Sequence, residues 1–228
     1  MKRSEVNGIL KLAERRLKEN NIYLPAFASW GLQDWQDCAQ DLSTLRKVML
    51  GWDITDFGSK NFREVGAVLF TIRNGMADEP GVGTPYAEKM LFVQEGQRLP
   101  LHYHVTKTED IINRGGGDMF MILYHANEDG TIDYESDVHL DCDGIPRTVK
   151  AGERFLVTRG NSVTLRPYTA HIFGAEQGTG DLVAWEVSSV NDDKTDNYWC
   201  EPASRFSGIE EDEQPLHLLC NEYDQFIK

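Results

Sequence analysis

Residues 96–109 are Gly96-Gln-Arg-Leu-Pro-Leu-His102-Tyr-His104-Val-Thr-Lys-Thr-Glu109, and they decide how the rest of the chain is interpreted. Side chains two positions apart on a strand point to the same face, so we expect His102 and His104 to present two imidazoles to one point. Glu109 follows closely enough to add a carboxylate oxygen. Two neutral nitrogens and one oxygen suit Mn, Fe, Zn, Ni or Co, although two exposed strand histidines are the ordinary alternative. The stretch predicts a metal site beside a β-strand.

The sequence around this stretch is typical of an antiparallel all-β domain. From about residue 45 onward, short apolar runs alternate with Gly, Asn and Asp turns at intervals of roughly 8 to 12 residues. The expected strands are Ala67–Ile72, Glu88–Val93, Leu99–Val105, Met119–Tyr124, Val138–Leu140, Arg147–Val149, Arg154–Val157, Ser162–Leu165, His171–Ala175 and Leu182–Val187.

Helices are expected near the N-terminus. Apolar residues recur at close to helical spacing over residues 3–20, which predicts an amphipathic helix, and a weaker helical stretch covers Gln33–Gln40. After about residue 190 the chain is acidic and irregular. We therefore expect a single domain, with a helical extension over about residues 1–45, a β-barrel over about 60–190 and a C-terminal tail over about 190–228.

The spacing of five residues resembles the first motif of the cupin superfamily: Gly96, His102, His104, Glu109 and Gly116. The resemblance implies an all-β fold, a cupin β-barrel or jelly roll, with a metal held inside the barrel. A barrel interior also excludes water, which strengthens the effect of a metal ion on a bound substrate.

A second cupin motif should supply one more histidine further along the chain. Gly160, Pro167 and His171 resemble that motif. His171 is so far from the first pair in sequence that only a closed sheet brings them together. The two motifs together imply a metal ion bound by His102, His104, Glu109 and His171.

Three further stretches resemble the D-lyxose isomerase family of cupin sugar isomerases, and the likeness extends over about residues 60–200. They are Glu88-Lys89, the run from Lys107 to Gly117, and the run from Trp185 to Asp193. The resemblance implies interconversion of D-lyxose with D-xylulose, and of D-mannose with D-fructose, through a metal-stabilised enediol. It also implies Mn²⁺ as the cofactor, with Co²⁺, Zn²⁺ or Fe²⁺ as substitutes, and a homodimer that binds a small sugar.

Two residues within this likeness suit the chemistry of the reaction. Isomerisation moves a proton between neighbouring carbons, and we expect Glu186 to be the base, because a carboxylate in the apolar strand Leu182–Val187 is costly to bury without a partner. We expect Lys89 to stabilise the charge that develops on oxygen. Strand alternation leaves both orientations open: Lys89 points inward if Leu91 and Val93 do, and Glu186 faces solvent in the opposite register.

Three other residues are candidates for sugar binding. Lys107 and Arg114 flank Glu109 and either contact sugar hydroxyls or only pair with Asp110 at the surface, where such a pair contributes little. Asp193 belongs to an Asn-Asp-Asp run that is either a sugar-binding loop or a solvated turn.

The composition disfavours several classes of partner. The 228 residues include 23 basic and 37 acidic side chains and carry a formal charge of −14, which opposes binding to nucleic acid and to anionic lipids. No apolar run approaches the roughly 18 residues of a membrane span, and no apolar segment follows the first basic residues as in a signal peptide. The cysteines are scattered without a CxxC pair, which indicates reduced thiols in the cytoplasm.

Three other functions remain open from the sequence. A cupin dioxygenase or another oxidoreductase uses the same four ligands, so the ligands do not discriminate. A non-catalytic cupin binds the sugar without converting it. A sugar-phosphate isomerase needs a cluster of Arg and Lys for the phosphate, and the net acidity argues against one.

Overall fold

The computed structural model describes residues 1–192 and 195–227. The helices are α1 (Arg3–Glu19), the short 3₁₀ helix η1 (Ala26–Ser29), α2 (Leu32–Asp37), α3 (Ser43–Lys47) and α4 (Tyr223–Phe226). The strands are β1 (Gly51–Thr55), β2 (Ala67–Gly75), β3 (Gly83–Val93), β4 (His102–Tyr103), β5 (Glu109–Gly116), β6 (Met119–Ala126), β7 (Ile132–Asp133), β8 (Val138–Cys142), β9 (Ile145–Val149), β10 (Arg154–Val157), β11 (Ser162–Leu165), β12 (Thr169–Ala175), β13 (Leu182–Ser189) and β14 (Tyr198–Trp199). Among the described residues, no helix combines the length and apolarity that crossing a bilayer requires.

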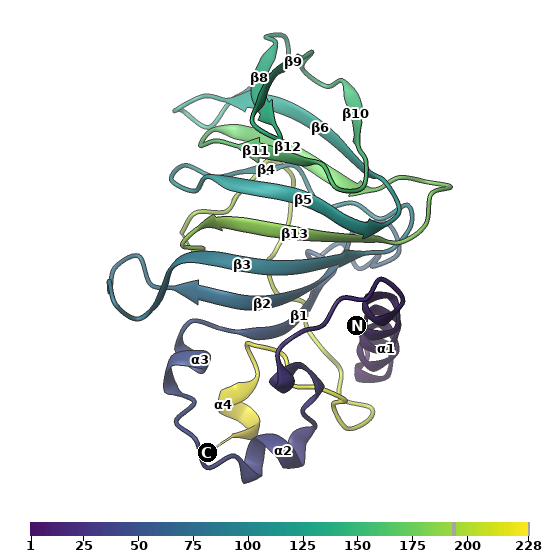
Figure 1. Ribbon diagram of the computed structural model, residues 1–228, viewed down its shortest axis with the longest axis vertical. Coiled ribbons are helices and arrows are strands. Elements are labelled where there is room, and N and C mark those ends of the chain that lie inside the picture. The colour runs from purple at the N-terminus through teal and green to yellow at the C-terminus, as the bar shows by residue number, and fades with distance from the viewer. Residues whose placement is uncertain (193–194, 228) are drawn as a thin grey trace.

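Two antiparallel sheets pack against each other and form the barrel (Figure 1). The larger sheet has the strand order β1-β2-β3-β13-β5-β11-β8-β9, and the smaller has the order β10-β6-β12-β4-β14, with β7 beside β6. Strands far apart in sequence are neighbours, as β13 is between β3 and β5. This long-range antiparallel pairing confirms the all-β cupin fold predicted from the sequence.

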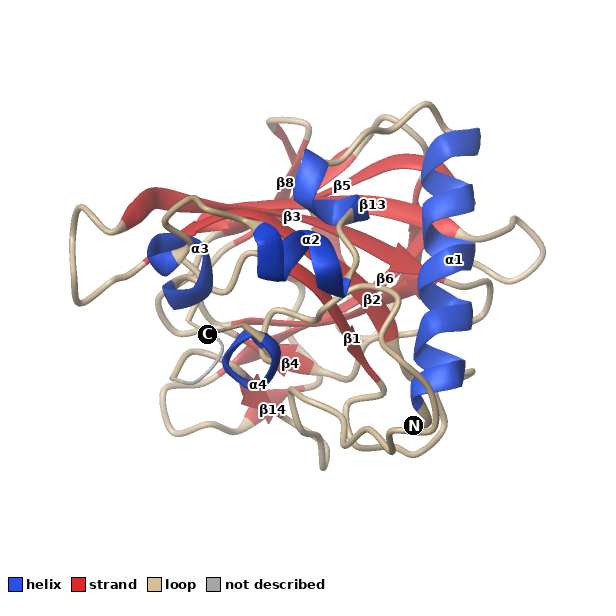
Figure 2. Ribbon diagram, turned by 90° about the horizontal axis from the view of Figure 1, so that it is seen from below, coloured by secondary structure: helices blue, strands red, loops and turns tan. Residues whose placement is uncertain are grey.

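Strand alternation divides the apolar side chains between two cores. Leu91 and Val93 of β3 point between the sheets, whereas Met90 and Phe92 point to the outer face of the larger sheet. Helix α1 covers that outer face (Figure 2) with the buried residues Val6, Leu10, Ala13 and Leu17. Burial of each of the Val and Leu side chains contributes about 1.5–3 kcal/mol, so the helix is held by packing.

The C-terminal segment binds the start of α1. The side chain of Arg3 is fully buried and forms ion pairs with Glu211 and Glu222. The Oγ of Ser4 donates to Asp212 at 2.8 Å. Carboxylates near a helix N-terminus are favourable because they complement the helix dipole, so the acidic tail stabilises the helix.

The predicted elements agree best with the structure where the apolar alternation is regular. The first helix is confirmed over Arg3–Glu19, the second is shorter than expected, and β10 and β11 have the predicted bounds. The predicted strand Leu99–Val105 is reduced to β4, because Pro100 has no N–H to donate to a sheet. Strand β5 was not expected because Glu109 and Asn113 occupy inward positions and interrupt the apolar pattern. The short elements β1, β7, β14, η1, α3 and α4 are not predicted by the sequence either.

Candidate active site

Three imidazoles converge between the two sheets. His102 lies on β4, His104 follows that strand, and His171 lies on β12. Strand pairing places His171 opposite His102, and the centroids of these two rings are 4.1 Å apart. One potential ligand nitrogen from each of the three buried residues lies within 4.8 Å of the other two. The structure therefore brings together the histidines of both predicted motifs.

Backbone carbonyls orient the three rings. The Nδ1 atoms of His102 and His171 donate to the carbonyl two residues earlier, at 2.8 and 2.9 Å. The Nδ1 of His104 donates to the carbonyl of Asp196. Because a carbonyl only accepts, each Nδ1 carries the proton and each Nε2 presents a lone pair.

Burial keeps the imidazoles of His102 and His171 neutral. Burial, together with the neighbouring His171 and His104, lowers the pKa of His102 well below its usual range. Burial also lowers the pKa of His171 to about 4, against a smaller opposing effect of Glu109. Neutral imidazole is the form that coordinates a metal ion.

Glu109 adds a carboxylate from the first residue of β5. Its Oε1 lies 3.2 Å from Nε2 of His171 and 3.5 Å from Nε2 of His104. These three atoms are buried and have no hydrogen-bond partner in the described part of the chain, and buried polar atoms without partners are rare. Three imidazole nitrogens and a carboxylate oxygen are donors that divalent metal ions prefer. The donor set therefore fits a divalent metal ion.

The larger sheet contributes charged side chains to the same buried space, which we call the chamber. Its lining includes the three imidazoles together with Lys89, Lys107, Glu109, Glu186, Asn191, Trp199 and Arg205. The Nζ of Lys107 lies 2.6 Å from Oε2 of Glu109 and 3.0 Å from Oε1 of Glu186. The Nζ of Lys89 lies 3.4 Å from the same oxygen of Glu186. Two carboxylates and two ammonium groups therefore face the imidazoles.

The lysines keep both carboxylates ionised. Burial alone would raise the pKa of Glu186, but Lys107 and Lys89 together lower it below its usual value. Burial is likewise outweighed at Glu109, where Lys107 and His104 hold the pKa well below its usual range. In turn, Glu109 and Glu186 overcome the effect of burial on Lys107 and raise its pKa. The chamber is therefore able to bind polar groups and to accept a proton.

Strand pairing places the two predicted catalytic side chains next to each other. Glu186 of β13 is the register partner of Lys89 of β3. Lys89 shares its face of β3 with Leu91 and Val93, and Glu186 shares its face of β13 with Ala184; all three apolar residues belong to the core between the sheets. Of the two orientations that alternation allows, the structure has the inward one for both side chains.

The predicted sugar-binding residues have different positions. Lys107 lines the chamber and does not pair with Asp110, which instead accepts a hydrogen bond from Thr164. Arg114 is exposed on β5 and is not among the residues that line the chamber. Asp193 lies outside the described residues.

Asp196 is a site residue that the sequence analysis missed. Its carboxylate accepts hydrogen bonds from the backbone N–H groups of Val105, Thr106 and Lys107, at 2.8, 3.1 and 3.0 Å. It therefore fixes the loop after His104, while its own carbonyl orients that histidine. No local sequence pattern signals this role, because Asp196 is 92 positions from His104.

An aromatic wall closes another side of the chamber. The ring of Trp199 lies 5.1 Å from that of His102 and 5.5 Å from that of Phe57, measured between centroids. Trp199 is one of five tryptophans in the sequence, and no sequence pattern signals that it contacts His102.

Solved structures share this fold at low sequence identity. The L-ribose isomerase of Acinetobacter sp. DL28 in complex with L-ribose superimposes with a TM-score of 0.61 at 16% identity, over 92% of this chain and 98% of that chain. The L-ribose isomerase of Cellulomonas parahominis with L-ribose has a TM-score of 0.58 at 15% identity, with the same coverage. At this identity the likeness establishes the fold alone.

Comparison of the sequence with known proteins identifies the family, which the structural likeness does not. The family model described as D-lyxose isomerase matches residues 1–223. The D-lyxose/D-mannose isomerase of Serratia proteamaculans is 42% identical over 229 residues, which cover 100% of both chains. The D-lyxose/D-mannose isomerase of Escherichia coli O157:H7 is also 42% identical, over 99% of this chain and 100% of that protein. The chain therefore belongs to the D-lyxose isomerase family and is an aldose–ketose isomerase.

Proposed function

We propose that the chain interconverts D-lyxose with D-xylulose, and D-mannose with D-fructose, through an enediol. The observation that carries the proposal is the position of Glu186, an ionised carboxylate in the same buried chamber as three imidazoles. The names of the two relatives, both D-lyxose/D-mannose isomerases, support the choice of sugars.

His102, His104, Glu109 and His171 are the proposed metal ligands. A divalent ion bound there supplies a Lewis acid that draws electron density from the carbonyl of the sugar. We propose Mn²⁺, with Co²⁺, Zn²⁺ or Fe²⁺ as substitutes, because nitrogen and carboxylate ligands accept all of these ions.

Glu186 is the proposed base. Its carboxylate removes the proton from the carbon next to the carbonyl and returns it to the former carbonyl carbon, a contribution of about 10²–10⁴-fold to the rate. The lowered pKa of Glu186 keeps the carboxylate ionised before the substrate arrives. Lys89 and Lys107 flank the carboxylate and fix its position in the chamber.

Lys89 and Lys107 are proposed to stabilise the substrate oxygens. As the proton leaves carbon, negative charge moves onto the carbonyl oxygen, where a fixed ammonium group is most effective. The proton of the neighbouring hydroxyl must pass to that oxygen before the new carbonyl forms, and a lysine beside both oxygens can carry it. Both Nζ atoms lie within 3.4 Å of Oε1 of Glu186, so carbons over this carboxylate place their oxygens near the lysines. Sugar contact is therefore assigned to Lys107. Sugar binding by Asp193 stays a prediction. Arg114 is exposed and does not line the chamber.

Incubation with a panel of sugars tests the function. Purified protein is stripped with a chelator, refilled separately with Mn²⁺, Co²⁺, Zn²⁺ and Fe²⁺, and assayed with aldoses and ketoses under air and under anaerobic conditions. We expect D-lyxose and D-mannose to be converted at the same rate with and without oxygen. Oxygen consumption, or sugar binding without conversion, contradicts the proposal.

We propose that the enzyme is a cytoplasmic homodimer. The cupin resemblance supports the dimer, and the scattered cysteines support a reducing compartment. Light scattering on the purified protein measures the molar mass, and the mass of a monomer contradicts the proposed homodimer.

A further inference from the structure

The chamber is too small to hold a whole sugar. Its volume is about 40 Å³, whereas small-molecule pockets usually have about 300–1,000 Å³. One water molecule needs a cavity of about 10–15 Å³, so the chamber has room for a few water molecules. A pentose or hexose at the imidazoles therefore needs space outside the chamber.

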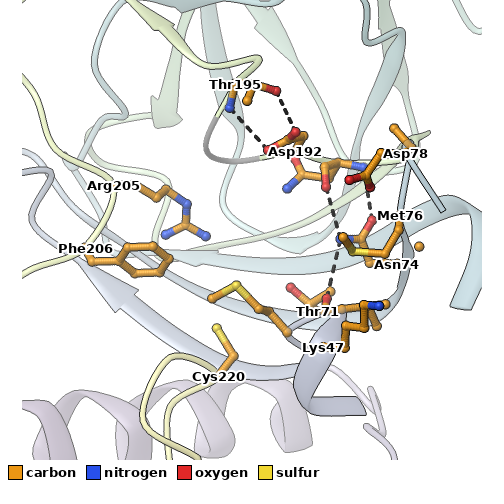
Figure 3. A pocket seen from close by; sticks show the side chains of 15 residues that line it. Lys47, Thr71, Asn74, Met76, Asp78, Asp192, Thr195, Arg205, Phe206 and Cys220 are labelled. Carbon is orange, nitrogen blue, oxygen red and sulfur yellow. Dashed lines mark hydrogen bonds between the residues drawn. The ribbon is translucent and has the colours of Figure 1, made fainter. Parts of the chain in front are cut away.

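A larger cavity, which we call the outer pocket, adjoins the chamber. Its volume is about 320 Å³, and Asn191 and Arg205 line both cavities. Figure 3 shows Arg205 and Phe206 on one side of the outer pocket and Asn74 and Asp78 on the other. The outer pocket and the chamber therefore share part of their lining.

The lining of the outer pocket suits a polyol. Hydroxyl groups need donors and acceptors, whereas the C–H groups between them pack against apolar surfaces, and ligand pockets combine both kinds of lining. The polar lining residues include Lys47, Thr71, Asp78, Asp192 and Thr195. The apolar ones include Met49, Met76 and Phe206.

We call the two residues that line both cavities, Asn191 and Arg205, the neck. The backbone N–H of Asn191 donates to Oδ1 of Asn74 at 3.0 Å, and its carbonyl accepts from Nδ2 of Asn74 at 3.1 Å. The side-chain oxygen of Asn191 accepts from Nζ of Lys107 at 3.4 Å. Arg205 forms an ion pair with the buried Asp53 of β1. Both sides of the neck are therefore anchored to the barrel.

We propose that the outer pocket is the subsite for the end of the sugar remote from its carbonyl, with the chain passing between Asn191 and Arg205. This inference rests on the proposed function, because it requires the carbonyl end to lie at the imidazoles. D-mannose has the configuration of D-lyxose at carbons 2 to 4 and one further carbon at the remote end. The two sugars therefore differ only in the part that enters the outer pocket.

Filling the outer pocket tests the subsite. Ala77→Trp and Thr195→Trp each add an indole from a different segment of the lining. Glu135→Trp adds the same group on the exposed turn between β7 and β8 and is the matched control. We measure kcat/KM for D-lyxose and D-mannose, and by calorimetry the dissociation constants of the corresponding five- and six-carbon alditols, which lack a carbonyl and bind without turnover.

Both filling variants should lower kcat/KM for D-mannose at least about tenfold more than for D-lyxose, since one misfitting carbon costs about 10–200-fold. In both variants, binding of the six-carbon alditol should weaken relative to binding of the five-carbon alditol by a similar factor. The control should leave unchanged both the ratio of the two kcat/KM values and the ratio of the two dissociation constants. If a Trp variant does not fold, Ala77→Leu fills part of the same space. If folded variants show equal changes in kcat/KM for both sugars and equal changes in binding of both alditols, the proposed subsite is wrong. If the wild type converts no aldose, the proposed function fails, and the alditol measurements still decide the subsite.

Discussion

Oε1 of Glu186 lies 3.0 Å from Nζ of Lys107, and both side chains are buried inside the barrel. The two residues are 79 positions apart in the chain and meet because β13 pairs with the start of β5, which follows the loop that carries Lys107. A buried carboxylate stays ionised only while a cation remains beside it. The protonation state of Glu186 therefore depends on Lys107.

Lys107→Met should move the acid limb of the pH profile to higher pH. Lys107 and Lys89 hold the pKa of Glu186 below its usual value against the effect of burial; without Lys107, burial prevails and the pKa rises. Activity that needs the ionised base disappears as the pH falls through this pKa, so the loss begins at a higher pH in the variant. We would measure kcat/KM against pH with saturating metal. Lys150→Met, which removes an exposed partner of Asp137, is the control, and an acid limb that stays in place in Lys107→Met contradicts the assignment.

Asp196→Asn should weaken metal binding by about 10–100-fold, the usual effect of losing a residue that supports metal ligands. The neutral amide no longer accepts strong hydrogen bonds from three consecutive backbone N–H groups after His104. Competition with a coloured chelator measures the dissociation constant. The matched control is Asp129→Asn, because Asp129 also accepts a backbone N–H but lies on an exposed hairpin. Equal metal affinity in the two variants shows that Asp196 has no positioning role.

The contrast between His102 and Asp196 explains how far the sequence could predict the site. The two histidines of the first motif are two positions apart on the chain, so spacing alone indicates their common target. Glu186 is recognisable as a carboxylate within an apolar strand, but its inward orientation depends on the register of β13 against β3. Asp196 acts through contacts with a segment 90 positions earlier, and no local pattern encodes them.

The same reasoning applies to the strands. Alternation predicts strands whose inner face is apolar, such as β10 and β11. It does not predict β5, because the polar residues Glu109 and Asn113 occupy inner positions on that strand. The sequence signal is therefore weak where polar side chains interrupt the inner face of a strand.

His217 should make stability depend on pH. Burial alone would lower its pKa, but hydrogen bonds to Glu14 and to the carbonyl of Trp30 raise it above the usual value. The protonated form therefore stabilises the fold fully below the unfolded pKa of about 6.5, and this contribution is lost as the pH rises through the folded pKa. We expect the melting temperature of the wild type relative to His217→Gln to fall as the pH rises from about 6.5 into the alkaline range. A constant difference across this range refutes the prediction.

Arg3→Met should destabilise the fold by about 3–5 kcal/mol, because the partner Glu222 stays buried without a counter-charge. The side chain of Arg3 is 0% exposed and that of Glu222 is 7% exposed. Urea unfolding measures the free energy, and adding Glu222→Gln should recover part of the loss. The folded variant should keep its kcat, since Arg3 is not among the residues that line the chamber. A loss below about 1 kcal/mol, the level of an exposed pair, contradicts the prediction.

The most direct test of the account is turnover of D-lyxose in deuterated water by Glu186→Gln, with the metal content measured on the same sample. The substitution preserves the size of the side chain and removes the base, whereas the four proposed metal ligands are unchanged. The account predicts wild-type metal content, a loss of turnover of at least about 10²-fold, and no deuterium exchange at the carbon next to the carbonyl. Glu128→Gln, an exposed substitution of the same kind, should behave as the wild type. Near-normal turnover by Glu186→Gln with metal bound would contradict the account.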